Sequence, residues 1–187
     1  MAVQLVTHRF TAKDFHRMAE AGILREDGRV ELLHGEIVDM PPIGPGHAAS
    51  VRRLLNSFLP LQLNGKVIIS VQNPIHLEEH SEPQLDLALL KPQPDFYAQG
   101  HPTSQEVLLA VEVMESSAGY DREVKVPLYA RGGIPEIWLV DVERELIEVY
   151  RDPSPEGYRQ VHTRRRGERL SPEVFPQFTL TVDEVLG

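Results

Sequence analysis

The sequence predicts an α/β fold in which helices flank a mixed central sheet. Two nearly continuous apolar runs, at residues 85–90 and 107–114, are typical of strands buried on both faces of a sheet. A third apolar run, 137–140, follows a stretch with helical spacing, 121–131, which Gly132-Gly133 would end. A strand, a helix and a second strand in this order predict a right-handed parallel crossover.

A helix and a hairpin are expected before the sheet. Thr11, with Asp14 three residues later, has the spacing of a weak capping box and begins a predicted helix over residues 11–21. The turn His34-Gly35 is flanked by two short predicted strands, at 30–33 and 36–40.

Proline affects both of the longer helical patterns. In the pattern at 47–63, Pro60 is expected to end or kink the helix early. In the pattern at 121–131, Pro127 predicts that the regular helix starts near that residue, which places Lys125 on the entry loop. Further strands are expected at 67–71, 75–77, 146–150, 158–162 and 178–181, followed by a helical turn at 182–186.

Length and composition limit the class of protein. The 187 residues, 41% of them hydrophobic, predict a single domain over residues 1–187 with a substantial core. The chain has no cysteine, so disulfides and thiolate metal sites are excluded. Neither a signal peptide nor an apolar run of about 18 residues is present, so we expect a cytoplasmic protein without a membrane span.

The net charge of −9 argues against broad, non-specific nucleic-acid binding, which usually depends on a basic surface. It is compatible with an acidic site that reaches phosphate through a divalent metal. Two basic clusters, Arg52-Arg53 and residues 164–166, favour solvated surface.

Two acids stand where apolar side chains are expected. Asp86 and Glu112 each interrupt a buried strand, and a carboxylate there is costly unless it is paired or binds a cation. If the two strands are neighbours, both carboxylates can point to one spot, where Mg²⁺ or Mn²⁺ would relieve their repulsion. The alternative is that each acid lies at a strand end in water.

Three further residues are candidates for the same site. Lys125 could reach back over the strand ends and orient or deprotonate a water, or it could simply pair with Asp121 one helical turn earlier. Glu31, in the first hairpin, could complete a cation site or face solvent. His47 begins a helix and could line a cleft, although a structural role is more common for such a histidine.

Other chemistries fit poorly. The chain contains no Gly-x-Ser-x-Gly elbow, P-loop or dinucleotide fingerprint. Its eight histidines are scattered and lack His-x-x-x-His spacing on a helix, which argues against a zinc hydrolase.

Taken with their spacing, these residues resemble the PD-(D/E)xK nuclease superfamily, whose fold is called restriction-endonuclease-like. The chain is more specifically similar to the large bacterial "Uma-two" endonuclease family, over most of its length. The superfamily's proline-aspartate pair is here Leu85-Asp86, and its E-x-K tripeptide is Glu112-Val113-Met114, without the lysine. Lys125 is the position that matches the lysine this family is thought to carry on the next helix.

The resemblance implies a Mg²⁺- or Mn²⁺-dependent endonuclease that hydrolyses DNA phosphodiester bonds. Asp86, Glu112 and the Val113 carbonyl would hold the metal, Lys125 would assist the attacking water, and Glu31 would support the metal or its waters. Two alternatives are a non-catalytic binding or assembly protein on the same scaffold, and a nuclease for RNA or branched DNA. Nucleases of this fold often pair to cut two strands, so we also expect a homodimer.

Overall fold

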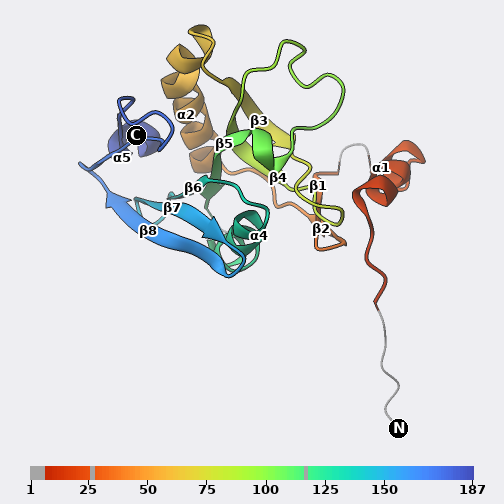
Figure 1. Ribbon diagram of the computed structural model, residues 1–187. Coiled ribbons are helices and arrows are strands. Elements are labelled where there is room, and N and C mark those ends of the chain that lie inside the picture. The colour runs from red at the N-terminus through yellow and green to blue at the C-terminus, as the bar shows by residue number, and fades with distance from the viewer. Residues whose placement is uncertain (1–6, 26–27, 116–117) are drawn as a thin grey trace.

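The computed structural model describes residues 7–25, 28–115 and 118–187 (Figure 1). The first half of the chain contains α1 (Ala12–Glu20), β1 (Val30–Leu33), β2 (Glu36–Asp39), α2 (Pro45–Leu63), β3 (Ile68–Pro74) and β4 (Gln84–Leu90). The second half contains η1 (Ser104–Glu106), β5 (Val107–Met114), α3 (Ala118–Tyr120), η2 (Asp121–Lys125), α4 (Val126–Arg131), β6 (Glu136–Asp141), β7 (Leu146–Ser154), β8 (Gly157–Arg165), β9 (Arg169–Leu170), β10 (Leu180–Thr181) and α5 (Val182–Leu186).

Six strands form the central sheet, in the order β3-β4-β5-β6-β7-β8. β5 and β6 are parallel and are joined through the helical segment α3-η2-α4, as the predicted crossover requires. The other neighbouring pairs are antiparallel, so the sheet is mixed and the predicted fold class is confirmed. The β1-β2 hairpin lies outside this sheet and joins it through an isolated bridge between Leu32 and Glu82.

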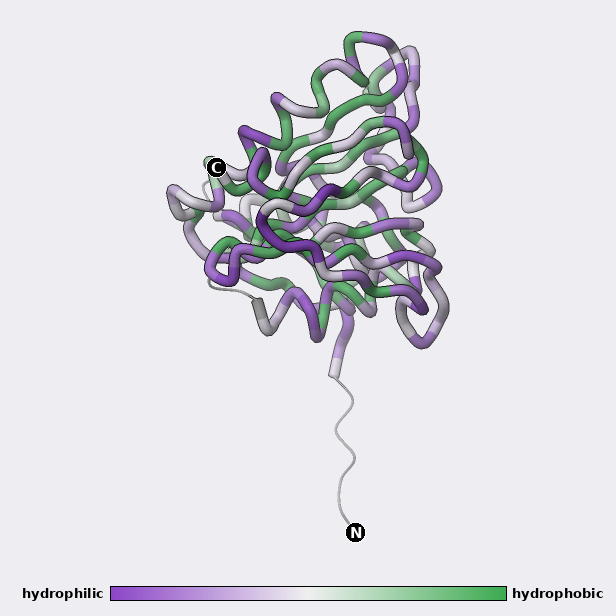
Figure 2. The backbone as a smooth tube through the Cα atoms, turned by 90° about the vertical axis from the view of Figure 1, so that its left-hand side faces the viewer, coloured by the Kyte–Doolittle hydropathy of each residue, from purple (hydrophilic) through white to green (hydrophobic). Residues whose placement is uncertain are grey.

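Helices cover both faces of the sheet. On one face, Leu54 and Phe58 of α2 pack with Trp138 of β6 in a cluster that also includes α5. On the other face, Leu128 and Tyr129 of α4 pack against the opposite side of β5 and β6. The strands between them are therefore buried on both sides, which explains their continuous apolar runs, seen as green stretches through the middle of the molecule in Figure 2.

The N-terminal elements follow the sequence pattern closely. Thr11 caps α1 through the full capping box with Asp14. His34-Gly35 forms the hairpin turn, and both residues have positive φ, 51° and 78°. Of the residues of α1, Ala12 alone is buried, so this helix contributes little to the core.

Two expectations from the sequence were wrong here, an early end of α2 at Pro60 and separate strands at 67–71 and 75–77. α2 continues through Pro60 to Leu63, because a proline this near the C-terminus removes only one hydrogen bond of the last turn. The predicted strands 67–71 and 75–77 are replaced by one strand, β3, which runs through Pro74. β3 is at the sheet edge and pairs only with β4, so the missing proline N–H costs no ladder bond.

The expected start of the regular helix near Pro127 is confirmed, whereas the expected position of Lys125 on an entry loop was wrong. The regular helix α4 begins at Val126, with Pro127 in its first turn, and Lys125 ends the π-helical turn η2 rather than lying on a loop. π-helical turns are rare and are frequently found at functional sites. No helix in the described ranges is both long and apolar enough to span a bilayer.

Candidate active site

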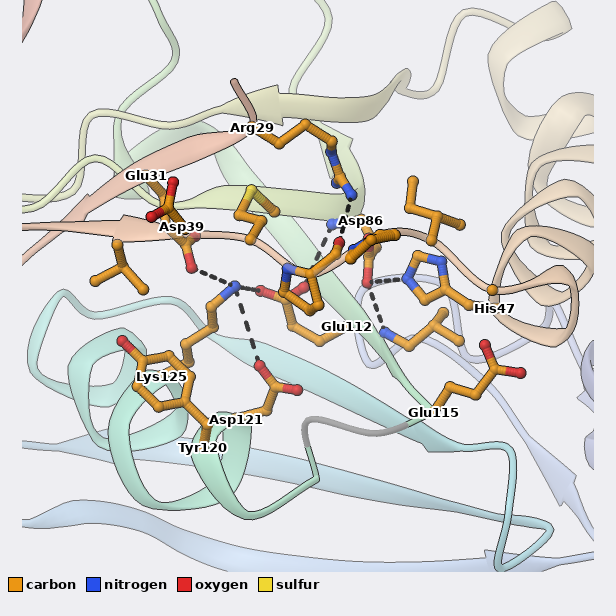
Figure 3. Close-up of a pocket in the computed structure, with 17 residues that line it drawn as sticks. Arg29, Glu31, Asp39, His47, Asp86, Glu112, Glu115, Tyr120, Asp121 and Lys125 are labelled. Atoms are coloured by element: carbon orange, nitrogen blue, oxygen red, sulfur yellow. Dashed lines mark hydrogen bonds and ion pairs between the residues drawn. The ribbon is translucent and has the colours of Figure 1, made fainter. Parts of the chain in front are cut away.

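A cavity of about 270 Å³ opens beside the C-terminal end of β5, where α2, the hairpin and η2 come together. All four side chains expected from the sequence line it: Glu31, Asp86, Glu112 and Lys125. Figure 3 shows them converging from four separate elements, β1, β4, β5 and η2.

The antiparallel register of β4 and β5 brings Asp86 and Glu112 together. Leu87 pairs with Val111, so the next position along β4, Asp86, is level with Glu112. Cross-strand neighbours present their side chains on the same face of a sheet. The Asp86 amide lies 3.4 Å from Oε2 of Glu112, and the two side chains are 8% and 3% exposed as residues. The two acids therefore lie close together, as the sequence predicted.

Asp86 is fixed from two sides. Its Oδ2 accepts a hydrogen bond from the Val113 amide at 2.9 Å and lies 2.8 Å from Nε2 of His47, in the first turn of α2. The second ring nitrogen of His47, Nδ1, is buried and has no hydrogen-bond partner among the described residues. His47 is a member of the site that the sequence suggested only weakly, because nothing in the sequence shows that the start of α2 lies over β4.

Lys125 lies among three carboxylates and is 5% exposed. Its Nζ is 3.1 Å from Glu31, 3.4 Å from Glu112 and 4.0 Å from Asp121. The pairing with Asp121 that the sequence offered as an alternative is the longest of the three. The closest partner of Lys125 comes instead from the hairpin.

Glu31 is buried, which rules out the solvent-facing alternative for this residue. One carboxylate oxygen faces Lys125, and the other accepts a hydrogen bond from the Gln84 amide at 3.2 Å. Because Gln84 begins β4, this contact ties the hairpin to the strand that carries Asp86.

Charge in the cavity is unbalanced. Burial raises the pKa of Glu112 well above its usual value; Lys125 opposes this shift, whereas Asp86 and Asp121 add to it. Burial acts to lower the pKa of Lys125, but Glu112, Glu31 and Asp121 outweigh it, so this pKa is raised. The raised pKa favours the ammonium form of Lys125, which can orient a water or stabilise negative charge.

Tyr129 contacts the site, although the sequence did not single it out. Its side chain is fully buried, and its hydroxyl donates a short hydrogen bond to Oε1 of Glu112. Burial and the neighbouring Glu112 raise the pKa of Tyr129, so the phenol remains a donor. In the sequence this residue reads as part of the apolar side of a helix, and its hydroxyl gave no separate signal.

The donor set suits a hard divalent cation. Four buried carboxylates, those of Glu31, Asp86, Glu112 and Asp121, line the cavity together with one buried lysine, and a cation would offset the excess charge. Oε1 of Glu112 is engaged by Lys125 and Tyr129, whereas Oε2 faces Asp86. Mg²⁺ commonly uses one or two protein carboxylates and keeps several waters, and this site offers such a pair.

Comparison with known proteins agrees with the fold. The family model Uma2, described as "Putative restriction endonuclease", matches residues 12–183. A crystal structure described as that of a putative nuclease belonging to DUF820, from Anabaena variabilis, superposes with a TM-score of 0.72 at 12% sequence identity, covering 95% of this chain and 97% of that one. At this identity the likeness shows a shared fold. No protein with curated annotation matches the chain.

Proposed function

Because the chain belongs to the Uma2 family of restriction-endonuclease-like proteins, we propose that it is a Mg²⁺- or Mn²⁺-dependent endonuclease that hydrolyses phosphodiester bonds in DNA. The observation that carries the proposal is the placement of Asp86 and Glu112 side by side, with Lys125 against the second of them. A carboxylate pair that can hold a divalent metal, with a buried cation beside it, supports metal-assisted attack of water on phosphorus.

Asp86 and Glu112 would hold the metal, which, when bound, supplies Lewis-acid activation of the phosphate and lowers the pKa of a bound water. The Val113 amide donates to Asp86, which lies toward β4. In a strand, the N–H and C=O of one residue point to the same side, so we expect the Val113 carbonyl to face the same place and add a ligand.

Lys125 and Glu31 act as a unit in this proposal. The Lys125 ammonium orients the attacking water and stabilises the charge that develops on the phosphoryl oxygens. Glu31 holds Lys125 by an ion pair of 3.1 Å and so fixes its direction. His47 orients the Asp86 carboxylate through its contact at Oδ2, in the way that a second layer of residues orients metal ligands.

Cleavage of supercoiled plasmid DNA tests the proposal. We expect nicking or linearisation by the wild type with Mg²⁺ or Mn²⁺, none with EDTA, and none by Asp86→Asn or Glu112→Gln, which keep the side-chain shapes. Glu143→Gln, at an exposed acid, is the matched control and should cleave normally. Equal cleavage by all four proteins would identify a contaminant and reject the site. Single-stranded RNA and branched DNA in the same assay separate the substrate classes.

A second candidate, a non-catalytic binding or assembly protein, is favoured by one observation. Lys125 already bridges Glu31 and Glu112, so the carboxylates have a cation partner without a metal. Calorimetry discriminates the two functions. The endonuclease requires Mg²⁺ or Mn²⁺ binding that Asp86→Asn removes, whereas the binding protein shows no heat that depends on Asp86.

We also propose a homodimer formed through β8. This strand is at the edge of the sheet and is exposed along most of its length, with Val161 51% exposed. An unpaired strand edge is a template for association with another copy. Sedimentation analysis should give a dimer for the wild type and a monomer for Val161→Lys; a wild-type monomer at micromolar concentration contradicts the proposal.

A further inference from the structure

Two histidines and a buried glutamate meet away from the candidate active site. His16 comes from α1, Glu82 precedes β4, and His101 lies in the loop between β4 and η1. One ligand atom from each lies within 4.8 Å of those of the other two. Within residues 7–25, 28–115 and 118–187, this is the only such group of three or more His, Asp or Glu side chains. We infer that His16, Glu82 and His101 form a binding site for a divalent transition metal of the zinc class.

His16 already contacts the other two side chains. His16 Nε2 lies 2.7 Å from Oε1 of Glu82, and the rings of His16 and His101 stack with their centroids 5.8 Å apart. Tetrahedral zinc with bonds of about 2.0–2.1 Å separates its ligand atoms by about 3.3 Å. Because His16 and His101 are exposed, their rings can turn by the small amount that this spacing requires.

The Glu82 carboxylate is buried and its backbone is fixed in place. Its side chain is 3% exposed, and its amide donates to the Leu32 carbonyl at 2.7 Å, which locks the backbone to β1. On the far side, Nδ1 of His76 lies 3.6 Å from the other carboxylate oxygen. A carboxylate buried among imidazoles is costly to desolvate unless a positive charge accompanies it, and a bound metal would supply that charge.

The donor set selects the class of metal. Two imidazoles and one carboxylate suit Zn²⁺, and they also suit its neighbours in the first transition series, whereas Mg²⁺ prefers an all-oxygen set such as Asp86 and Glu112. An open depression lined by His16, His76, Glu82 and His101 leaves room for a water as the fourth ligand. The two sites therefore differ in chemistry as well as in place.

Metal at this position would tie α1 to the domain. Apart from His16, this helix is attached by the Ala12 amide, which donates to the Glu79 carbonyl at 2.8 Å, and it buries only Ala12. His101 belongs to a loop whose Pro102 carbonyl accepts from the His76 amide. One ion would thus cross-link three segments of the chain, and it would stabilise the fold by binding the native state alone.

The inference can be tested by titrating the full chain with Zn²⁺ alone. The Asp86→Asn variant serves as the parent protein, so that Zn²⁺ binding at the proposed active site does not contribute to the signal. We expect one saturable Zn²⁺ per chain and a melting temperature that rises by about 5–10 °C when free Zn²⁺ is about 100-fold above its dissociation constant. Hydrogen exchange of the α1 amides should slow when Zn²⁺ is added. Mg²⁺ at the same concentration should produce neither effect.

Variants at the exposed ligands identify the site without threatening the fold. His16→Ala and His101→Ala should each lose the saturable binding and the rise in melting temperature, and Glu82→Gln should lose them too. His162→Ala, at an exposed histidine of β8, is the control and should behave as the parent protein. Unchanged Zn²⁺ binding in His16→Ala and His101→Ala, or no saturable binding in the parent, would show a plain hydrogen-bonded contact and overturn the inference. Either result is independent of whether the chain cleaves DNA.

Discussion

The Lys125 ammonium nitrogen lies 3.1 Å from a carboxylate oxygen of Glu31, although the two residues come from opposite halves of the chain. Both side chains are buried, so their charges depend on each other. The contact joins the N-terminal hairpin to the π-helical turn and holds the lysine beside Glu112 (Figure 3).

Removal of Lys125 should therefore cost stability as well as activity. Lys125→Met leaves Glu31, Glu112 and Asp121 without their shared cation, and breaking such a buried pair typically costs about 3–5 kcal/mol. Urea unfolding measures the loss, with Lys66→Met at an exposed lysine as the control. Adding Glu31→Gln to Lys125→Met should recover part of the stability. If the double variant is the less stable of the two, the charge explanation is wrong.

Glu112 should make the metal-free protein less stable as the pH rises. Its pKa in the folded state lies above the ordinary value of 4.5, so the fold favours the protonated carboxyl. The stability contributed by this group is complete below pH 4.5 and is lost as the pH rises through the folded pKa. The free energy of unfolding should be measured in EDTA from pH 5 to 9 for the wild type and for Glu112→Gln. The difference between the two should shift in favour of Glu112→Gln as the pH rises. A difference that stays constant over this range contradicts the prediction.

Tyr129→Phe removes the hydroxyl that donates to Glu112. Because this hydrogen bond lowers the pKa of Glu112, its loss should raise that pKa further. Mg²⁺ and Mn²⁺ require the ionised carboxylate, so calorimetric metal affinity should fall at neutral pH, and its pH dependence should move to higher pH. We expect a stability loss of about 1–3 kcal/mol as well. Tyr158→Phe, whose hydroxyl bonds to the Ile134 carbonyl outside the site, should lower stability without moving the pH profile.

His47→Gln tests the orientation of Asp86. The imidazole contact at 2.8 Å fixes one carboxylate oxygen, and loss of such an orienting partner typically costs about 10–100-fold in metal affinity or activity. Cleavage rates should be measured at several Mn²⁺ concentrations, since a positioning residue is expected to raise the metal requirement more than it lowers the rate at saturation. His162→Gln serves as the control. A lower saturating rate with an unchanged metal requirement would assign His47 a different role.

The sequence by itself determined the elements that position the site. Two apolar runs, each interrupted by one acid, identified β4 and β5, because a strand buried on both faces requires apolar side chains at successive positions. Helical spacing that ends at two glycines identified the crossover. These patterns were sufficient to predict the mixed sheet and to single out Asp86 and Glu112, with Lys125 as a further candidate, whereas the role expected for Glu31 came from the family resemblance.

Only the tertiary structure decided which side chains meet. The β4–β5 register set Asp86 beside Glu112, and the packing of α2 and the hairpin brought in His47 and Glu31. Tyr129 and the cluster of His16, Glu82 and His101 gave no local signal, because their partners lie far along the chain and periodicity reports only neighbours on one element. The course of β3 through Pro74 was likewise set by its place at the sheet edge, which no local pattern records.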